Sequence, residues 1–312
     1  MDALLNGLRA AGEPTRLRLL ALCAHGELSV SELVRILGQS QPRVSRHLKL
    51  LVEGGLLERF REGALVFYRI AEKTDAAQLA RTLIDLIPAD DAALARDLAR
   101  LETVHEERAA AAARYFERVA ESWDELRALY LPQSELERAL EEMLGSRPLG
   151  ELVDIGTGTG SLLRLLADRV ERGVGIDLSH EMLNVARSNI ERAGLRNVHV
   201  RRGDMYALPL DDAAFDLATL HQVLHYAADP RAAIREAARV LRPGGRLVVV
   251  DFAPHAEERL RSEHQHLRMG FADEEIRRHV EDAGLLWQPP RQLAGDPLSI
   301  TIWQASKPAG LH

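Results

Sequence analysis

Residues 149–170 read LGELVDIGTGTGSLLRLLADRV and carry the strongest structural signal in the chain. They predict a short apolar strand over 152–155, a turn rich in glycine, and a helix that begins near Ser161. The glycines of the turn are Gly156, Gly158 and Gly160. Without side chains there, a bound molecule can approach the backbone closely, and the amino end of the helix offers free N–H groups. We therefore expect a ligand where the strand ends.

The spacing of these glycines distinguishes two classes of ligand. A dinucleotide-binding turn places its third glycine one position later than this chain does. Here the order is Gly-x-Gly-x-Gly, and Asp154 stands two residues before the first glycine. The pattern favours S-adenosylmethionine over a dinucleotide.

Acidic residues end two later predicted strands. Strand 174–177 finishes in Asp177, which is suited to accept hydrogen bonds from both hydroxyls of a ribose. A helix over 181–193 and a strand over 198–201 precede Asp204, which is placed to accept a hydrogen bond from an adenine amino group. These positions are the ones that a doubly wound sheet provides for a nucleoside.

Strands and helices continue to alternate towards the end of the chain. FDLATLHQVLHY (215–226) predicts a fourth strand, and REAARVLRPGGRLVVVDF (235–252) predicts a helix, a Pro-Gly-Gly turn and a fifth strand. A last helix over 272–284 and closing antiparallel strands over 285–288 and 298–305 complete the expected sheet.

Over about residues 114–306 this series resembles the class I methyltransferases of the ubiquinone/menaquinone biosynthesis type. The resemblance implies an α/β fold with a doubly wound, mostly parallel seven-stranded sheet that binds S-adenosyl-L-methionine or S-adenosyl-L-homocysteine. It makes Met182 the neighbour that stacks on adenine, Met205 a backbone contact, and His221 the position that faces the sulfonium. The implied cofactor-binding residues are Asp154, Gly156, Gly158, Gly160, Asp177, Met182, Asp204, Met205 and His221. A fold that keeps these residues without binding anything is the alternative.

Methyl transfer from a sulfonium needs proximity and alignment more than a fixed acid or base. The candidate catalytic residues, placed near strand ends where a proton acceptor or an orienting group is useful, are His221, His225 and Tyr226, with Tyr206 as a further candidate. For His225 and Tyr226, packing within a loop is an equally good interpretation. Cys23 is the only cysteine, so a thiol-based arsenic methyltransferase mechanism is disfavoured.

The first 72 residues have a different pattern. A helix from Pro14, helices over 29–37 and 40–52, and a hairpin formed by 56–60 and 65–70 predict an all-α-plus-hairpin winged helix-turn-helix domain. Basic residues, Arg69 among them, outnumber acidic ones around the third helix and the hairpin, in a chain whose net charge is −7. The candidate DNA-binding residues are Ser40, Gln41, Arg43, Ser45, Arg46, Lys49, Arg59 and Arg61. Val44, Leu48, Leu50 and Leu51 are expected to form the buried stripe. A solvated face of a protein-interaction module is the alternative.

Three segments carry a second resemblance: GEPTRLRLLAL (12–22), LSVSELVRILGQSQPRVSRHLKLLVEGGLLERFREG (28–63) and VFYRI (66–70). Residues 3–72 resemble the ArsR-type winged-helix regulators. This implies a homodimer that binds an inverted repeat in double-stranded DNA, with leucine stripes at 4, 5 and 8 and at 79, 83 and 86 available for the seam. The metal-sensing cysteines and histidines of that family are missing from the corresponding helices, and His105 suits a charged surface, so no metal site is expected.

The middle of the chain, residues 73–144, is predicted to be a helical dimerisation or connector region between the winged helix (1–72) and the cofactor domain (145–307). Within it, residues 115–126 resemble a helix that covers the cofactor, although Tyr115, Phe116 and Trp123 also suit a core. No apolar run of about 20 residues and no signal-peptide pattern is present, which predicts a cytoplasmic protein with no membrane partner.

Two functions remain open. The first is a DNA-binding transcriptional regulator whose second domain senses S-adenosylmethionine, either as a sensor alone or also as an active enzyme with a small-molecule acceptor. The second is a small-molecule methyltransferase whose winged helix only dimerises or targets it.

Overall fold

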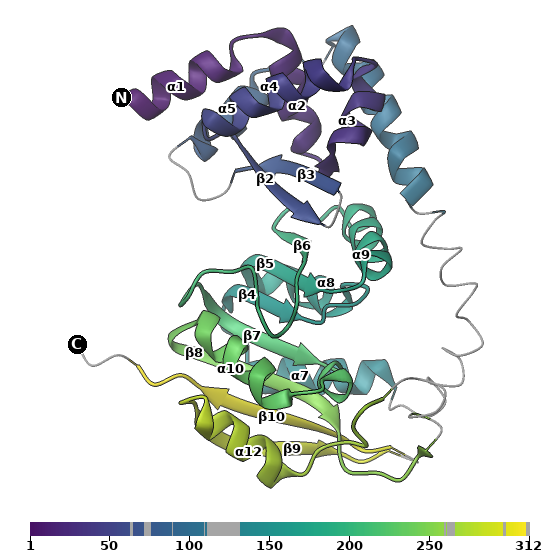
Figure 1. The fold of residues 1–312 in the computed structure, drawn as a ribbon, viewed down its shortest axis with the longest axis vertical. Helices are drawn as coiled ribbons and strands as arrows, with labels where there is room; N and C mark the ends of the chain where they lie inside the picture. Colours follow the sequence, from purple (N-terminus) through teal and green to yellow (C-terminus); the bar gives the residue numbers. More distant parts are fainter. Residues whose placement is uncertain are drawn as a thin grey trace. The chain divides into compact units, whose positions relative to one another are not determined.

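The structure, a computed structural model, describes residues 1–62, 65–71, 76–88, 90–108, 110, 132–258, 260, 266–295 and 298–309. The chain divides into two compact units, Met1–Ala111 and Ala112–His312, each with its own hydrophobic core (Figure 1). None of the helices in the described ranges combines the length and the apolarity needed to span a bilayer. The segment 115–126 lies outside the described residues.

The first unit is a bundle of helices on a small antiparallel sheet. Its elements are α1 (Asp2–Ala11), α2 (Pro14–Cys23), β1 (Leu28–Ser29), α3 (Val30–Leu37), α4 (Gln41–Glu53), β2 (Leu57–Glu62), β3 (Leu65–Ile70), α5 (Ala77–Asp85) and a helix over 92–108. The strands pair in the order β1-β3-β2. This is the predicted winged helix-turn-helix order, with α3 and α4 as the helix-turn-helix.

Local signals set the ends of α3. The Ser29 hydroxyl accepts a hydrogen bond from the Glu32 N–H, and the Glu32 carboxylate accepts one from the Ser29 N–H, which forms a capping box. Gly38 ends the helix at φ +63°, a conformation that suits glycine. Both boundaries agree with the sequence prediction.

The burial of two side chains in this unit differs from the prediction: Leu50 was expected to be buried and Arg69 to be exposed. Leu50 is 38% exposed, because Val44, Leu48 and Leu51 repeat at helical spacing and Leu50 falls outside their face. Arg69, on β3, is only 7% exposed. Its guanidinium forms ion pairs with the carboxylates of Glu27 at 3.5 Å and Glu58 at 3.1 Å. It therefore does not belong to the exposed basic face.

The second unit is a seven-stranded sheet in the order β6-β5-β4-β7-β8-β10-β9, parallel except for β10, which is antiparallel to both its neighbours. Its strands are β4 (Gly150–Ile155), β5 (Val170–Asp177), β6 (Val198–Arg202), β7 (Phe215–His221), β8 (Leu241–Phe252), β9 (Leu286–Leu293) and β10 (Ile300–Ser306). The predicted doubly wound sheet is confirmed.

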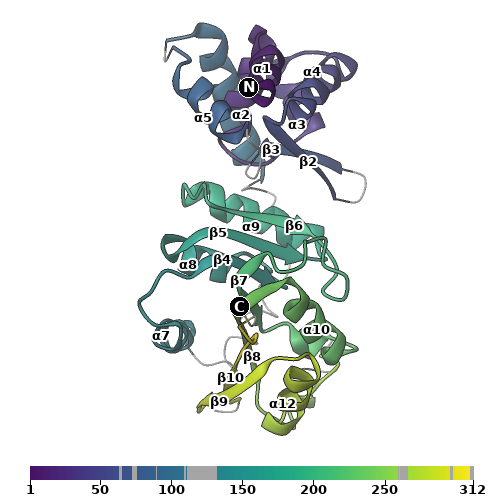
Figure 2. The same cartoon turned by 90° about the vertical axis from the view of Figure 1, so that its left-hand side faces the viewer.

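Helices cover both faces of this sheet. One face buries α7 (Gln133–Leu144), α8 (Ser161–Leu166) and α9 (His180–Arg192). The opposite face buries α10 (Pro230–Val240) and α12 (Asp273–Asp282), as Figure 2 shows. The chain leaves the central strand β4 for β5 and β6 on one side, and later for β7 and β8 on the other. Such a reversal of direction forms a crevice at the carboxyl ends of the strands.

The predicted Pro-Gly-Gly turn is a bulge inside β8. Pairing with β7 moves from Phe215 opposite Leu241 to Leu217 opposite Arg246, so the residues between 241 and 246 loop out of the ladder. Gly244 adopts φ +81° there, which glycine tolerates. The predicted fifth strand is therefore present, but it begins before the Pro-Gly-Gly turn, at Leu241, and not after it.

Candidate functional site

The glycine turn after β4 has left-handed backbone at every second residue. Gly156, Gly158 and Gly160 have φ of +73°, +53° and +74°. A side chain at Gly156 would collide with Val223, whereas one at Gly158 would meet nothing within 4 Å. The backbone at Gly158 therefore faces open space, which leaves room for a ligand.

Asp177, at the end of β5, is tied to this turn. Its carboxylate accepts hydrogen bonds from the N–H of Gly158 at 2.9 Å and of Ser179 at 2.8 Å. Burial raises the pKa of Asp177, and these backbone N–H groups oppose the shift. Each carboxylate oxygen keeps a second lone pair with which to accept a hydroxyl.

Asp154 lies beneath the turn. It is 1% exposed, and its Oδ1 accepts a hydrogen bond from Thr219 Oγ1 at 2.7 Å. Burial raises the pKa of Asp154 to about 6. Asp154 thus links β4 to β7 under the site and does not present an exposed carboxylate.

The end of β6 presents a more open surface. Asp204 is exposed, and its Oδ1 accepts a hydrogen bond from the Tyr206 N–H at 3.0 Å. Met205 and Met182 are both partly buried. The Tyr206 hydroxyl accepts a hydrogen bond from the Asp229 N–H at 3.3 Å. Asp204 therefore offers an acceptor to a ligand at this strand end.

Strand register brings these ends together. Ile155 of β4 pairs with Ile176 of β5 and with Leu220 of β7. Gly156 is therefore flanked by Asp177 on one side and His221 on the other. Of the residues predicted to bind the cofactor, those at or after the carboxyl ends of β4, β5 and β7 therefore lie side by side, and Asp204 follows the end of the neighbouring strand β6.

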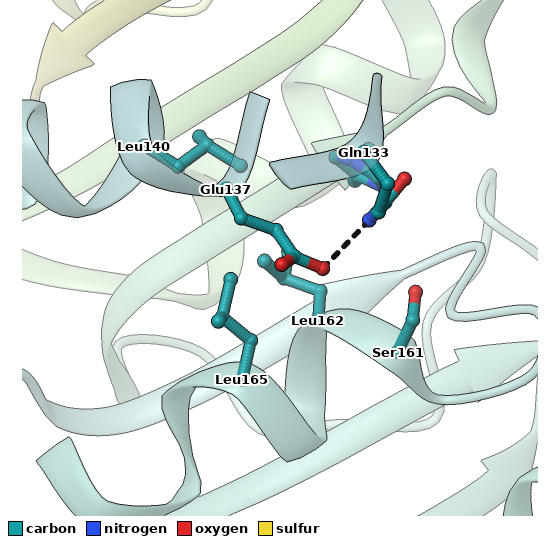
Figure 3. Close-up of a pocket in the computed structure, with 7 residues that line it drawn as sticks. Gln133, Glu137, Leu140, Ser161, Leu162 and Leu165 are labelled. Carbon is teal, nitrogen blue, oxygen red and sulfur yellow. Dashed lines mark hydrogen bonds between the residues drawn. The ribbon is translucent and has the colours of Figure 1, made fainter. Parts of the chain in front are cut away.

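His221 lines a narrow hollow between α7 and α8 that is too tight to hold a water molecule (Figure 3). The other residues of this α7–α8 hollow are Gln133, Glu137, Leu140, Ser161, Leu162 and Leu165. Glu137 reaches from α7 towards α8, and its Oε1 accepts a hydrogen bond from Gln133 Nε2 at 3.0 Å. Burial lowers the pKa of His221 to about 4, so its imidazole is neutral at pH 7. The next residue, Gln222, has φ +52°, a strained conformation typical of functional sites.

His225 and Tyr226 differ in their surroundings. His225 is 1% exposed, and its Nδ1 lies 2.8 Å from Asp251 Oδ1. Its backbone N–H donates to Asp251 Oδ2, and its ring stacks on His266 with centroids 4.0 Å apart. Tyr226 is 43% exposed. His225 is therefore a packed and oriented residue, while Tyr226 is accessible at the same strand end.

In the first unit, α4 presents a polar, basic face. Ser40 (the N-cap), Gln41, Arg43, Arg46 and Lys49 are exposed, and Ser45 is partly buried. Arg59 and Arg61 on β2 are also exposed. Lys49 Nζ lies 3.7 Å from Glu53, a surface pair that salt screens.

The two units match two different families of known proteins. Residues 153–249 match the family described as a methyltransferase domain, and residues 13–59 match the bacterial regulatory proteins of the arsR family. The chain joins an arsR-type unit to a methyltransferase domain. Both resemblances drawn from the sequence are confirmed.

Curated relatives of this domain are named as methyltransferases. The demethylmenaquinone methyltransferase of Tropheryma whipplei is 34% identical over 152 residues, 48% of this chain and 62% of that protein. The ubiquinone/menaquinone biosynthesis C-methyltransferase UbiE of Vibrio vulnificus is 38% identical over 113 residues, 35% of this chain and 44% of that protein. The chain spans 32% to 62% of the lengths of the first curated relatives it matches.

A solved structure supports the fold alone. The structure of YcgJ from Bacillus subtilis has a TM-score of 0.51 to this chain at 22% identity. It covers 57% of this chain and 100% of YcgJ. The match agrees with the seven-stranded sheet of the methyltransferase domain.

Three residues of the second unit were not predicted from the sequence but lie at or beside the site: Asp251, Glu137 and Gln222. Asp251 ends a predicted strand, the same signal that pointed to Asp177, and the strand-end rule finds it. Glu137 precedes the fold motif, and only the packing of α7 on α8 brings it to His221. Nothing in the local sequence indicates the positive φ of Gln222.

Proposed function

We propose that this chain is a DNA-binding transcriptional regulator whose methyltransferase domain binds S-adenosylmethionine or S-adenosylhomocysteine and so acts as a sensor. One observation carries the proposal: strand register lines up Asp177, the open backbone at Gly158 and His221 along one edge of the sheet. An adenosyl ligand with a sulfur-containing tail would place its ribose at Asp177, its tail at Gly158 and its sulfur at His221.

The residues present fit such a ligand. Asp204 receives the adenine amino group between Met182 and Met205, and Asp177 receives the ribose hydroxyls. The tail passes over Gly158 towards α7, and its ammonium group meets the carboxylate of Glu137 at the rim of the α7–α8 hollow, which must widen to admit more of it. Opposite charge in a partly buried hollow favours this orientation.

His221 is suited to the sulfonium end because it is neutral. Its pKa of about 4 keeps the imidazole uncharged throughout the physiological range, so it does not repel a cationic sulfur. The bound donor supplies an activated methyl group. His221 and the exposed Tyr226 then orient an acceptor, with His225 held behind them by Asp251.

In the arsR-type unit, α4 enters the major groove. Arg43, Arg46 and Lys49 contact phosphates or base edges, with Ser40, Gln41 and Ser45 beside them and Arg59 and Arg61 on the wing. Two copies of the unit bind an inverted repeat. Leu4, Leu5 and Leu8 of α1 are 46%, 40% and 42% exposed and supply an apolar seam between the copies.

The experiment is an operator-binding titration on the full chain. A duplex selected by the chain from a randomised pool is titrated at fixed salt with saturating S-adenosylhomocysteine and without it. A change in affinity supports the sensor, because a ligand shifts an equilibrium only through different affinities for the two states. Equal affinities remove the sensor role.

The competing function is a small-molecule methyltransferase whose arsR-type unit only dimerises. The exposed Tyr226, at the same strand end as His221, favours it, since an acceptor there would meet the methyl group. This function predicts turnover with an acceptor and no sequence-specific DNA binding. Selection from the randomised pool then enriches no sequence.

A further inference from the structure

The helix over 92–108 presents one continuous face to the core of the arsR-type unit. Asp97, Leu101, Val104 and Arg108 stand four, three and four residues apart, the spacing of one helical face. Leu101 and Val104 are 3% and 1% exposed and pack in the same core as Leu33 and Ile36 of α3. The helix is therefore part of the DNA-binding unit.

A buried ion pair fastens this helix to α2. Arg18 binds Asp97 with both nitrogens of its fork, Nε to Oδ2 at 2.5 Å and Nη2 to Oδ1 at 2.8 Å. Asp97 is fully buried, so its carboxylate has exchanged water for this guanidinium. Paired geometry of this kind has few alternative arrangements.

Two further arginines hold the two ends of α3. At its start, Arg108 donates from Nε to Glu32 Oε1 at 3.0 Å and from Nη2 to Glu32 Oε2 at 2.9 Å, and also to the carbonyl of Glu27 at 2.9 Å. At its end, Arg100 Nη1 donates to the carbonyl of Ile36 at 2.8 Å.

Glu32 therefore takes part in two interactions at once, the capping box of α3 and the ion pair with Arg108. The same carboxylate closes the capping box with Ser29 and receives Arg108. Burial acts to raise the pKa of Glu32, but the charge of Arg108 and the hydrogen bonds from Ser29 outweigh it and hold that pKa below its usual range. Moving Arg108 therefore disturbs the cap of α3 directly.

The two helices match in length. From Arg100 to Arg108 the helix rises about 12 Å, which is also the length of the eight-residue α3. Because Arg108 meets the start of α3 and Arg100 its end, the helices run antiparallel. The first unit ends at Ala111, three residues after Arg108, and the second unit begins at the next residue.

We infer that the helix over 92–108 positions the helix-turn-helix, with Arg108 as the positioning residue, and that it transmits the state of the methyltransferase domain to DNA binding. The first part rests on the contacts above. The second part rests on the proposed sensor function. A shift of this helix moves α3 as a unit, and α3 leads through Gly38 into the recognition helix α4.

The test uses full-length chains carrying Arg108→Ala or, as a milder change, Glu32→Gln, which keeps a capping-box residue but removes the charge. Arg35→Ala is the matched control, because the Arg35–Glu107 pair joins the same two helices but is 53% and 55% exposed. Hydrogen exchange of α3 amides is followed without ligand. Arg108→Ala is expected to speed exchange in α3 by about tenfold or more, Glu32→Gln less, and Arg35→Ala by less than about twofold.

The second readout is the ratio of DNA affinities with and without S-adenosylhomocysteine, on the duplex selected by the wild-type chain. Arg108→Ala is expected to bring this ratio to about one while ligand binding persists, and Arg35→Ala to keep it. Unchanged α3 exchange in both Arg108→Ala and Glu32→Gln overturns the positioning role. A loosened α3 with an intact ratio overturns transmission. If the wild-type ratio is itself one, the sensor function and transmission fail together, and α3 exchange still decides positioning.

Discussion

Asp154 is the buried carboxylate that connects pH to the stability of the methyltransferase domain. Its pKa of about 6 lies above the unfolded value, so the folded chain binds more protons between pH 4 and 6. The free energy of unfolding should then fall as pH rises through this window, by on the order of 2 kcal/mol. Asp154→Asn should reduce this slope, and the part due to Asp177, whose pKa burial also raises, should remain.

Urea unfolding of the methyltransferase domain at a series of pH values measures this effect. The exposed Asp168→Asn is the matched control and should leave the slope in place. If Asp154→Asn keeps the wild-type slope, Asp154 does not take up the proton.

Glu137 tests the assignment of the ligand's tail. Glu137→Gln should weaken S-adenosylhomocysteine binding by about tenfold, because it removes a charge-assisted contact to the ammonium. Binding of 5′-methylthioadenosine, which lacks the amino-acid end, should not change. Calorimetry with both ligands measures this, with the exposed Glu141→Gln on the same helix as control. Equal losses for both ligands would argue for a general disturbance of the site.

The DNA-binding role of α4 can be tested through its exposed arginines. Arg43→Ala and Arg46→Ala should each weaken binding to the selected duplex and lower the slope of log affinity against log salt by about one, as expected when a phosphate contact is lost. Fluorescence anisotropy over a salt series measures both quantities. Arg138→Ala, on the exposed side of α7, should behave as wild type. Unaltered binding in both α4 variants would place the interface elsewhere.

Element boundaries were predictable where the sequence carries a local cause. Ser29 with Glu32 and the left-handed Gly38 define α3, and the glycine turn defines the exit of β4. Asp177 and Asp204 were found because strand ends in a parallel sheet meet at one edge. These signals need only neighbours in the chain.

The exposure of some side chains and the pairing of others depend on residues far away in the sequence. This is why the sequence predictions for Arg69 and Leu50 were wrong and why the pairs of Asp251 and Asp97 were not predicted. Arg69 looks exposed until Glu27 and Glu58 are placed beside it on the sheet. Leu50 looks like part of an apolar run until the helical phase of α4 is fixed. The pairing of Asp251 with His225 and of Asp97 with Arg18 joins residues 26 and 79 positions apart. No local pattern contains such contacts.

At the scale of the molecule, two units with separate cores predict two thermal transitions. Saturating S-adenosylhomocysteine, at about 100 times its Kd, should stabilise the methyltransferase domain by about 2.7 kcal/mol and raise mainly its transition. The selected duplex should raise mainly the other transition. Calorimetric scans with each ligand alone check this, and a single transition that both ligands shift equally would contradict the independence of the cores.

The central claim is that the strand-end crevice from Asp204 to His221 binds an adenosyl ligand with a sulfur-containing tail. Isothermal titration of the folded, full-length chain with S-adenosylhomocysteine tests it most directly. We predict saturable binding of about one ligand per chain, lost in a chain whose Asp177 is replaced by Ala. No binding heat from either S-adenosylhomocysteine or S-adenosylmethionine at several temperatures, on protein whose circular dichroism shows it folded, would contradict the account.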